Sequence, residues 1–183
     1  MNSDVARSDD GGTSPRQEIP MIEVRIASLN ADANSGQPVL LLAPVVEPVD
    51  DSRLLPIWIG HAEATSILMA MDGAELLRPM THDLLANVIA SLDFIVERIE
   101  ITRLDEGTYY AAIVLRGEER TLVVDARPSD GIALAVRERC PIYVARDVWE
   151  QGAVSVAVAD DAEDEVERFR EFLNHVEPSD FMS

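Results

Sequence analysis

The sequence IVERIEITRLDEGTYYAAIVLRGEERTLVVD, residues 95–125, decides the fold class of this chain. Apolar and β-branched residues dominate three of its segments, and two short polar links separate them. The predicted strands are residues 95–104, 109–115 and 121–125, and the links are Asp105-Glu106-Gly107 and Arg116-Gly117-Glu118. Strand patterns joined by such short links are typical of antiparallel hairpins. Residues 95–125 are therefore predicted to form a three-stranded antiparallel meander.

Helices are predicted on both sides of this meander. Residues 81–92 carry an apolar stripe at helical spacing, which consists of Leu84, Leu85, Val88, Ile89 and Leu92. Thr81 has a good N-cap side chain, and Asp83 in the first turn favours the helix dipole. Residues 129–139 form the next predicted helix, with Pro128 and Ser129 as start signals, and a short strand follows at residues 142–145.

The N-terminal half begins with strand patterns. Ile22, Val24 and Ile26 recur with the two-residue period of a half-buried strand. Residues 39–46 and 54–59 are the next predicted strands, and a helix is predicted at residues 61–71, with Ala64, Ile67, Leu68 and Met71 on one face. Strands and helices do not alternate regularly, so the predicted fold class is α+β, a mostly antiparallel sheet with inserted helices.

Composition divides the chain into three parts. Residues 1–18 are rich in Ser, Asp, Gly and Arg and are predicted to be a disordered tail. Residues 19–151 are predicted to form one domain, and residues 152–183 an acidic C-terminal segment. Within that segment, residues 164–176 have the pattern of an amphipathic helix, with an apolar face of Val166, Phe169, Phe172, Leu173 and Val176.

Several residue types are rare or missing, which excludes whole classes of site. All 15 basic residues are arginine, so a lysine Schiff base and a phosphate loop ending in Gly-Lys-Ser/Thr are excluded. Cys140 is the only cysteine, which excludes an intrachain disulfide and a multi-cysteine zinc site, and it is predicted to be a small buried residue. A metal site would be mainly carboxylate, which suits Mg²⁺ or Mn²⁺, and no motif for an organic cofactor occurs. The net charge of −19 opposes non-specific binding to nucleic acid.

The chain is predicted to be cytoplasmic and free of membrane contact. It has no apolar run long enough to span a bilayer, and its polar N-terminus lacks the pattern of a secretory signal. A strand-rich domain of this size exposes sheet edges that must be covered. The apolar strands, together with Trp58 and Trp149, favour a symmetric contact with a second copy, so a homodimer is predicted.

Three segments, in this order and at this spacing, resemble the bifunctional nuclease (BFN) family. They are Leu55-Pro56-Ile57-Trp58-Ile59-Gly60 with Glu63-Ala64, Arg78-Pro79-Met80-Thr81-His82-Asp83-Leu84-Leu85, and Asp125-Ala126-Arg127-Pro128-Ser129-Asp130-Gly131-Ile132-Ala133-Leu134-Ala135. The likeness covers roughly residues 21–150. Gly131 stands where the family usually has alanine, which removes no functional group. The resemblance implies nuclease activity on RNA and DNA, with nucleic acid as the substrate.

Acidic residues in these segments stand at the ends of predicted elements, where side chains can converge in a cleft. Asp125 ends a strand, while Asp83 and Asp130 open helices. These three are the predicted ligands of Mg²⁺ or Mn²⁺, with Glu63 as a weaker fourth. Metal ions held by carboxylates can supply the nucleophilic water and stabilise charge during phosphodiester hydrolysis. Together with His82, which can act as a general base or a ligand, Asp83, Asp125 and Asp130 form the predicted catalytic set.

Phosphate binding is assigned to four further positions. Arg78 and Arg127 are the predicted clamps, because a guanidinium group binds phosphate oxygens in a fork. The predicted helix starts at Thr81 and Ser129 offer backbone N–H groups that suit an anion.

The same residues have a structural interpretation, under which the chain is a non-enzymatic, oligomeric binding or regulatory module. This interpretation makes Thr81 and Ser129 helix caps, Asp83 and Asp130 dipole partners, Arg127 an ion-pair hub, His82 a satisfied core histidine and Trp58 a core or interface residue. The nuclease hypothesis predicts that the motifs surround an open cleft, whereas the alternative predicts a sealed polar network.

Overall fold

A mixed sheet dominates the part of the chain that the computed structural model describes, which is residues 20–32, 35–46, 53–74 and 77–155. Eight strands of these residues follow the order β6-β5-β4-β7-β1-β2-β3-β8. They are β1 (Met21–Ala31), β2 (Pro38–Pro44), β3 (Arg53–Trp58), β4 (Ile95–Asp105), β5 (Thr108–Arg116), β6 (Thr121–Ala126), β7 (Ile142–Ala145) and β8 (Val154–Ser155). Strands β4 and β7 run parallel, and the other neighbours are antiparallel. With the helices, this sheet confirms the α+β class.

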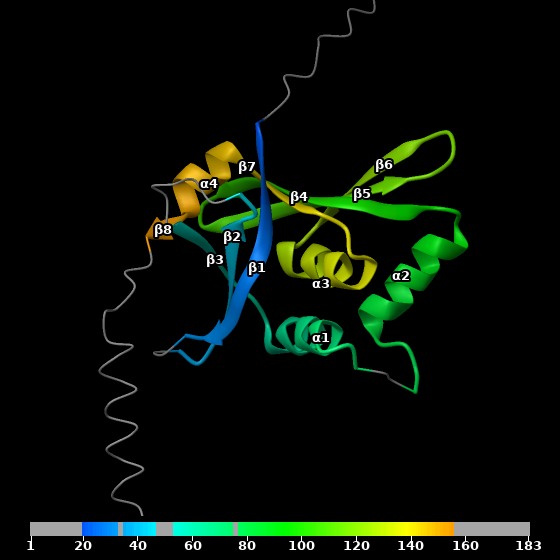
Figure 1. Cartoon of the computed structure of the whole chain (residues 1–183), viewed down its shortest axis with the longest axis horizontal. Helices are drawn as coiled ribbons and strands as arrows, with labels where there is room; N and C mark the ends of the chain where they lie inside the picture. Colours follow the sequence, from blue (N-terminus) through cyan, green and yellow to red (C-terminus); the bar gives the residue numbers. More distant parts are fainter. Residues whose placement is uncertain (1–19, 33–34, 47–52, 75–76, 156–183) are drawn as a thin grey trace, which may run out of the picture.

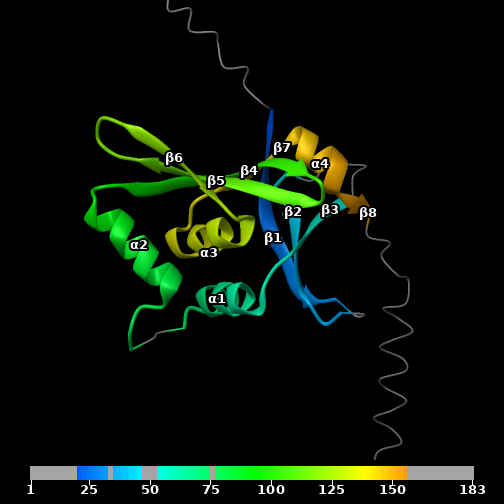
Figure 2. The same cartoon turned by 180° about the vertical axis from the view of Figure 1, so that it is seen from behind.

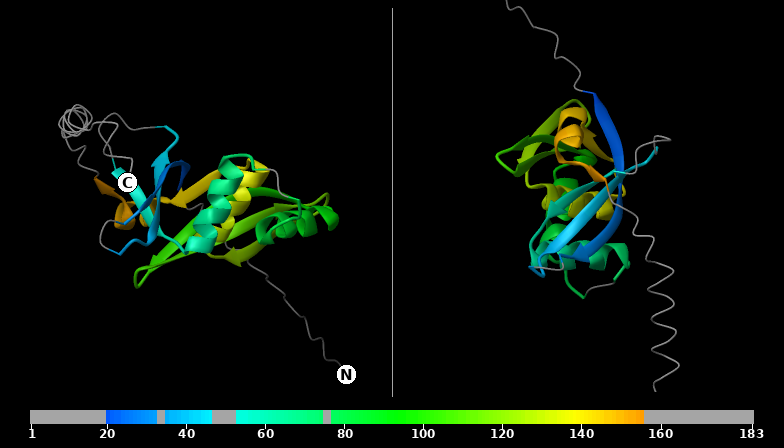
Figure 3. Two further views of the ribbon diagram at one scale, coloured as in Figure 1. Left: turned by 90° about the horizontal axis from the view of Figure 1, so that it is seen from below. Right: turned by 90° about the vertical axis from the view of Figure 1, so that its left-hand side faces the viewer.

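The helices fall into two groups. Helices α1 (His61–Met71), α2 (Thr81–Ser91) and α3 (Pro128–Glu138) gather on one side of β4 and β5, whereas α4 (Arg146–Gly152) lies apart from them beside β7 (Figures 1 and 2). Helix α3 is the centre of the first group, because it contacts α1, α2, β4 and β5. Figure 3 shows α1 and α3 side by side.

The meander β4–β5–β6 confirms the three predicted strands, and α3 packs on one face of it. Residues Glu106 and Gly107, both with positive φ, form the tight turn between β4 and β5. The register places Ile99, Ile113 and Val124 in one row across the three strands. A Cβ on Gly131 would lie 2.8 Å from Cγ2 of Ile99, so glycine at this position lets α3 approach β4 closely.

The predicted helix α2 is present, but most of its apolar stripe is exposed. Ile89 alone of the five stripe residues is buried, while Leu84, Val88 and Leu92 are 57%, 46% and 65% exposed. The reason lies in the topology, because α2 stands at the periphery and has only α3 and the start of β4 as substantial neighbours. Of the residues predicted to share one face of α1, Ala64 and Ile67 are buried, whereas Leu68 and Met71 are exposed.

Two further assignments concern the C-terminal third. The sequence patterns missed α4, which carries Trp149 with only 2% of its surface exposed. Trp149 therefore belongs to the core, and its predicted part in a contact with a second copy is wrong.

Cys140 is half-buried, and burial raises the pKa of its thiol to about 11, which suits a structural residue. The sheet continues to Ser155, while the predicted tail at 1–18 and helix at 164–176 lie outside the described residues.

Among the described helices, none combines the length and the apolar character needed to cross a membrane.

Candidate functional site

The two predicted corners, one at the start of α2 and one at the start of α3, come together around His82. Nε2 of His82 lies 3.2 Å from Oδ1 of Asp130, and Nδ1 lies 2.9 Å from Oγ of Ser66 on α1. His82 is only 9% exposed. One imidazole ring therefore joins α1, α2 and α3 through hydrogen bonds.

Donor and acceptor roles around His82 follow from a fourth residue, Arg137 of α3. Its Nη2 donates to Oγ of Ser66 at 3.0 Å, and a guanidinium group can only donate. Ser66 therefore accepts from Arg137, and its own hydroxyl hydrogen can be directed to Nδ1 of His82. The hydrogen on Nε2 is then donated to the Asp130 carboxylate. Both ring nitrogens have partners inside the protein.

Arg127, just before α3, is anchored by two carboxylates. Its Nε donates to Oδ2 of Asp130 at 2.7 Å, and its Nη2 donates to Oε1 of Glu63 at 2.7 Å and to Oδ1 of Asp130 at 2.9 Å. The Arg127 side chain is nevertheless 66% exposed, and its Nη1 has no hydrogen bond to any described residue. The guanidinium group is thus held in place with one amino group available to a ligand.

These ionisable groups stabilise one another in their charged forms. The pKa of Glu63 is lowered by a hydrogen bond from its own backbone N–H and by the Arg127 guanidinium. Burial alone would raise the pKa of Asp130, but hydrogen bonds from Arg127 and His82 outweigh it and hold that pKa below its ordinary value. Asp130 and Glu63 in turn raise the pKa of Arg127. Both carboxylates are therefore ionised at neutral pH.

The local sequence explains how Glu63 reaches this cluster. Glu63 lies in the first turn of α1, whose N-cap is Gly60. A Cβ on Gly60 would overlap Oε2 of Glu63, so a larger residue here would make the Glu63 side chain shift from its position beside Arg127.

Asp83 points away from Arg127 and serves the start of α2. Its Oδ2 accepts a hydrogen bond from the Met80 backbone N–H at 2.8 Å, and its Oδ1 accepts one from Nε of Arg137 at 2.5 Å. Arg137 first, and the Met80 N–H second, lower the pKa of Asp83. Nη1 of Arg137 also donates to the Ala133 carbonyl at 2.9 Å. Asp83 and Arg137 thus lock α2 onto α3.

The caps differ from the sequence prediction by one or two residues. Met80 is the N-cap of α2 and Arg127 is the N-cap of α3. Thr81 is instead the first residue of its helix, and Ser129 lies buried in the first turn without a capping hydrogen bond. The prediction that these two residues cap their helices is wrong, because α2 begins one residue, and α3 two residues, earlier than a cap at Thr81 or Ser129 requires.

Two pockets meet at Arg127. The His82 pocket, of about 200 Å³, is lined by Glu63, Ser66, Thr81, His82, Arg127 and Asp130 among others. The Trp58 pocket, of about 340 Å³, has Arg127 in its wall together with Trp58, Tyr109 and Ser129. The predicted motifs therefore surround open pockets, although the network beside them is internally satisfied.

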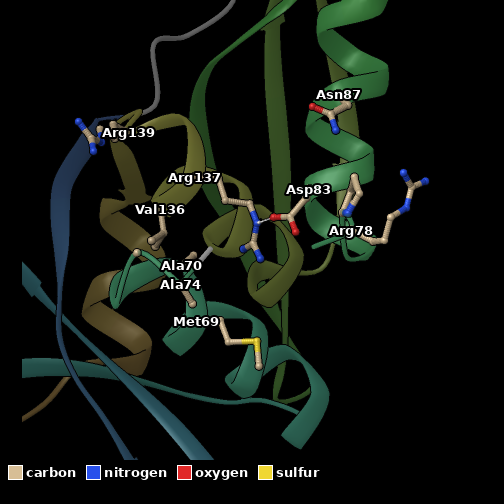
Figure 4. Close-up of a pocket in the computed structure, with 11 residues that line it drawn as sticks. Met69, Ala70, Ala74, Arg78, Asp83, Asn87, Val136, Arg137 and Arg139 are labelled. Atoms are coloured by element: carbon tan, nitrogen blue, oxygen red, sulfur yellow. Dashed lines mark hydrogen bonds and ion pairs between the residues drawn. The ribbon is translucent and has the colours of Figure 1, made fainter. Parts of the chain in front are cut away.

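A third and larger pocket, the arginine pocket of about 460 Å³, lies between α1, α2 and the end of α3. Figure 4 shows Arg78 and Arg139 at opposite sides of it, with the ion pair of Arg137 and Asp83 between them. Asn87 of α2 adds an amide to the same wall. Arg78 thus lines this pocket, and it does not form a clamp with Arg127.

Asp125 is not part of the cluster. It pairs with Ala112 on the edge strand β6, and the next residue, Ala126, packs against the core. Because neighbouring side chains of a strand project to opposite faces, the exposed Asp125 lies on the face away from α3. The expectation that Asp83, Asp125 and Asp130 converge is therefore wrong. Within the described ranges, no three His, Cys, Asp or Glu side chains are arranged to hold a metal ion.

Comparison with known proteins places this site in a family. The sequence pattern described as "Bifunctional nuclease domain" matches residues 45–157, which include all the segments that build the His82 pocket. The chain belongs to the bifunctional nuclease domain family.

Relatives of this bifunctional nuclease domain protein come from bacteria and plants. An uncharacterized protein of Mycobacterium tuberculosis is 40% identical over 168 residues, which cover 88% of this chain and 98% of the relative. Bifunctional nuclease 1 of Oryza sativa is 27% identical over 106 residues, which cover 56% of this chain and 32% of that protein. Bifunctional nuclease 2 of the same plant is 26% identical over 134 residues, with 71% and 40% covered. The plant relatives therefore share one part of their length with this chain.

Ser66 and Arg137 are the members of the network that sequence reasoning missed. Both are visible in hindsight through helical spacing. Ser66 follows Glu63 by three residues, and Arg137 follows Asp130 by seven, so each pair shares one face of its helix. A polar residue that lies on the same helix face as a motif acid, inside an otherwise buried helix, therefore indicates a further member of the network.

Proposed function

We propose that this bifunctional nuclease domain hydrolyses phosphodiester bonds of nucleic acids at the His82 pocket. The observation that carries the proposal is the Arg127 guanidinium group, which two carboxylates hold at the meeting point of two pockets while its Nη1 stays available. A fixed, exposed guanidinium is suited to a phosphate oxygen and to the charge that develops on it during hydrolysis.

Glu63 and Asp130 are the groups that can handle the attacking water. Both are ionised at neutral pH, because hydrogen bonds hold each pKa below its ordinary value. In the proposed reaction the water oxygen attacks phosphorus and its proton passes to a carboxylate. The bond to the leaving sugar oxygen breaks, and that oxygen keeps the electron pair and takes up a proton from solvent water. His82 acts as a positioning residue, because its two nitrogens are engaged with Ser66 and Asp130.

The predicted Mg²⁺ or Mn²⁺ ion does not fit this arrangement. The facing oxygens of Glu63 and Asp130 already accept hydrogen bonds from Arg127, which occupies the position that a shared cation would take. The proposal therefore gives Arg127 the role of neutralising charge and routes no step through a metal.

The arginine pocket explains how a polyanion approaches a protein with a net charge of −19. The His82 network contains three carboxylates and two guanidinium groups, so it does not attract phosphate by itself. Arg78 and Arg139 line the neighbouring pocket and form no ion pair with a described residue.

The direct test is cleavage of labelled single-stranded RNA and DNA by the purified chain, in EDTA and with added Mg²⁺ or Mn²⁺. We expect activity in EDTA and a loss of about a hundredfold in Arg127→Ala, the size that removing one charge-stabilising donor produces. Glu63→Gln should lose activity as well. Asp125→Asn is the matched control, since this exposed acid lies off the site, and it should retain full activity.

Three results would contradict this assignment: equal activity of Arg127→Ala, loss of activity in the control, or a strict metal requirement. The last would restore the carboxylate–metal prediction. Thermal melting of each variant separates loss of chemistry from loss of fold.

A second candidate function is supported by the completeness of the network. His82, Ser66, Asp83 and Arg137 all have partners within the protein, as a purely structural network would. Under this candidate the chain binds a ligand at the arginine pocket without turnover. Binding of an oligonucleotide that is never cleaved in any of the conditions above would favour it.

A further inference from the structure

Trp58 is a large aromatic residue at the end of β3 that the core leaves out. It is 52% exposed, whereas the other tryptophan, Trp149, is 2% exposed. Of the two structural roles predicted for Trp58, core or interface, the core role is therefore wrong, and the interface role stays a prediction. An exposed indole in the wall of a pocket is surface that a ligand can cover.

The Trp58 pocket has the composition of a site for a flat, partly polar ring. Trp58 and Tyr109 supply aromatic surface from β3 and β5. Tyr109 is partly buried, and burial raises the pKa of its hydroxyl, so the ring stays neutral. Gln37, Thr108 and Ser129 add amide and hydroxyl groups that can bond to the edge of such a ring.

Arg127 joins this pocket to the proposed catalytic site, because it lines both. A phosphate bound at its Nη1 would thus have the carboxylates on one side and the aromatic wall on the other. The pockets also differ in size. The His82 pocket, about 200 Å³, is below the usual range for small-molecule sites of about 300–1,000 Å³, whereas the Trp58 pocket, about 340 Å³, is within it.

We propose that the Trp58 pocket binds one nucleobase of a single-stranded nucleic acid, stacked on Trp58, next to a phosphate held by Arg127. A base can enter only when it is splayed out of a stack, which single strands allow and duplexes resist. Stacking on an aromatic side chain tolerates any base, so the site selects for strandedness rather than sequence. The choice of ligand rests on the proposed function, while the pocket itself does not.

The test uses tryptophan fluorescence of the full chain titrated with a short single-stranded oligonucleotide, in a buffer where the oligonucleotide is verified to stay intact. Trp149 is buried and serves as an internal reference, so a change in emission reports Trp58. Single-stranded oligonucleotide should quench the emission, and a duplex of equal length should quench it far less. In the free protein, acrylamide should reach Trp58 readily.

Affinity is measured in parallel from the anisotropy of a labelled oligonucleotide. Trp58→Ala should weaken binding about tenfold, and Trp58→Phe, which keeps a ring, should weaken it less. An oligonucleotide with the same backbone but without bases should bind both variants and the native chain equally. Trp58 is exposed, so neither variant should lower the melting temperature by much, and melting curves verify this.

Two binding results would overturn the proposal: Trp58→Ala that binds the oligonucleotide as tightly as the native chain, or a native chain that binds the base-free oligonucleotide as tightly as the normal one. Two fluorescence results would also overturn it: a duplex that quenches the emission as strongly as the single strand, or a Trp58 that a second copy shields from acrylamide. Failure of the proposed nuclease is distinguishable. Quenching without cleavage leaves the base pocket standing and removes the catalytic proposal. Cleavage that does not depend on Trp58 would support the catalytic proposal and remove the base pocket.

Discussion

Helices α2 and α3 are neighbours of equal length, 11 residues each, but they are held by different forces. Helix α3 buries seven residues, among them Ile132 and Leu134 with no exposed surface. Helix α2 buries only His82 and Ile89. Hydrophobic burial fixes α3, whereas α2 is joined to α3 by the hydrogen bond between His82 and Asp130 and by the one that Arg137 donates to Asp83. The site therefore depends on a helix whose position is set by polar contacts.

The largest expected effect is a cavity in α3. Ile132→Ala should lower the free energy of unfolding by about 4 kcal/mol, since the side chain is fully buried. The matched change in α2, Val88→Ala, should cost less than about 1 kcal/mol, because Val88 is 46% exposed. Urea denaturation of both variants measures the difference. Equal losses would mean that α2 is packed as tightly as α3, which contradicts the comparison.

The next effect concerns the polar lock, by which we mean the hydrogen bonds that Arg137 of α3 donates to Asp83 of α2 and Ser66 of α1. Arg137→Ala removes hydrogen bonds to Asp83, Ser66 and the Ala133 carbonyl, and should cost about 2 kcal/mol, softened because Asp83 is partly exposed. Hydrogen exchange sharpens this test, since amides of α2 should lose protection while those of α3 keep it.

Arg139→Ala is the control for that variant, as Arg139 is exposed and forms no hydrogen bond or ion pair with a described residue. It should change stability by less than about 0.5 kcal/mol. A loss of protection spread evenly over both helices in Arg137→Ala would show that α2 is not separately anchored.

Acid should weaken the polar contacts before the apolar ones. The pKa values of Glu63 and Asp83 lie below their ordinary values of 4.5 and 3.8 in the folded chain. Their contribution to stability is therefore complete above those ordinary values and is lost as pH falls through the lower folded pKa values. Unfolding free energies between about pH 6 and pH 3 measure the loss.

Asp130→Asn provides the comparison for the acid series. Asp130 also has a lowered pKa, so the variant should be less stable at neutral pH and should lose less stability in acid than the native chain. An identical pH profile would show that Asp130 does not contribute through its charge.

Sequence patterns predicted the secondary structure well where one residue type sets the conformation. The turn at Glu106-Gly107 and the helix starting after Gly60 are examples, since positive φ or close approach selects glycine. The meeting of the His82 and Asp130 corners was also predictable, because both stand at the starts of helices, where side chains can converge. Local periodicity, by contrast, could not tell which apolar face is covered, because the stripe of α2 has the same pattern as a buried one.

The prediction for the site failed where it depended on strand orientation and on partners distant in sequence. Asp125 stands beside the right residues in the chain, but the two-residue period of β6 turns it to the other face. The role of Arg137 could not be predicted from the sequence, because its partner Asp83 lies 54 residues earlier and only the packing of α2 on α3 brings the two together. Arrangements of this kind are set by tertiary contacts rather than by local sequence.

The smallest expected effect on stability, and the one that probes the rest of α2, concerns the predicted homodimer. The exposed Leu84, Val88 and Leu92 of α2 lie at the same end of the molecule as the edge strand β6, whose Leu122 and Val124 are exposed as well (Figure 1). An apolar surface beside an uncovered sheet edge is suited to a two-fold contact. If a second copy covers it, Leu92→Glu should convert dimer to monomer in light scattering while changing the stability of the monomer by less than about 1 kcal/mol. Val154→Glu, at the other end of the sheet and also 50% exposed, should leave the dimer intact. A native chain that is monomeric, or two variants with the same oligomeric state, would contradict the predicted contact and leave α2 with its hydrogen bonds to α3 as its one supported role.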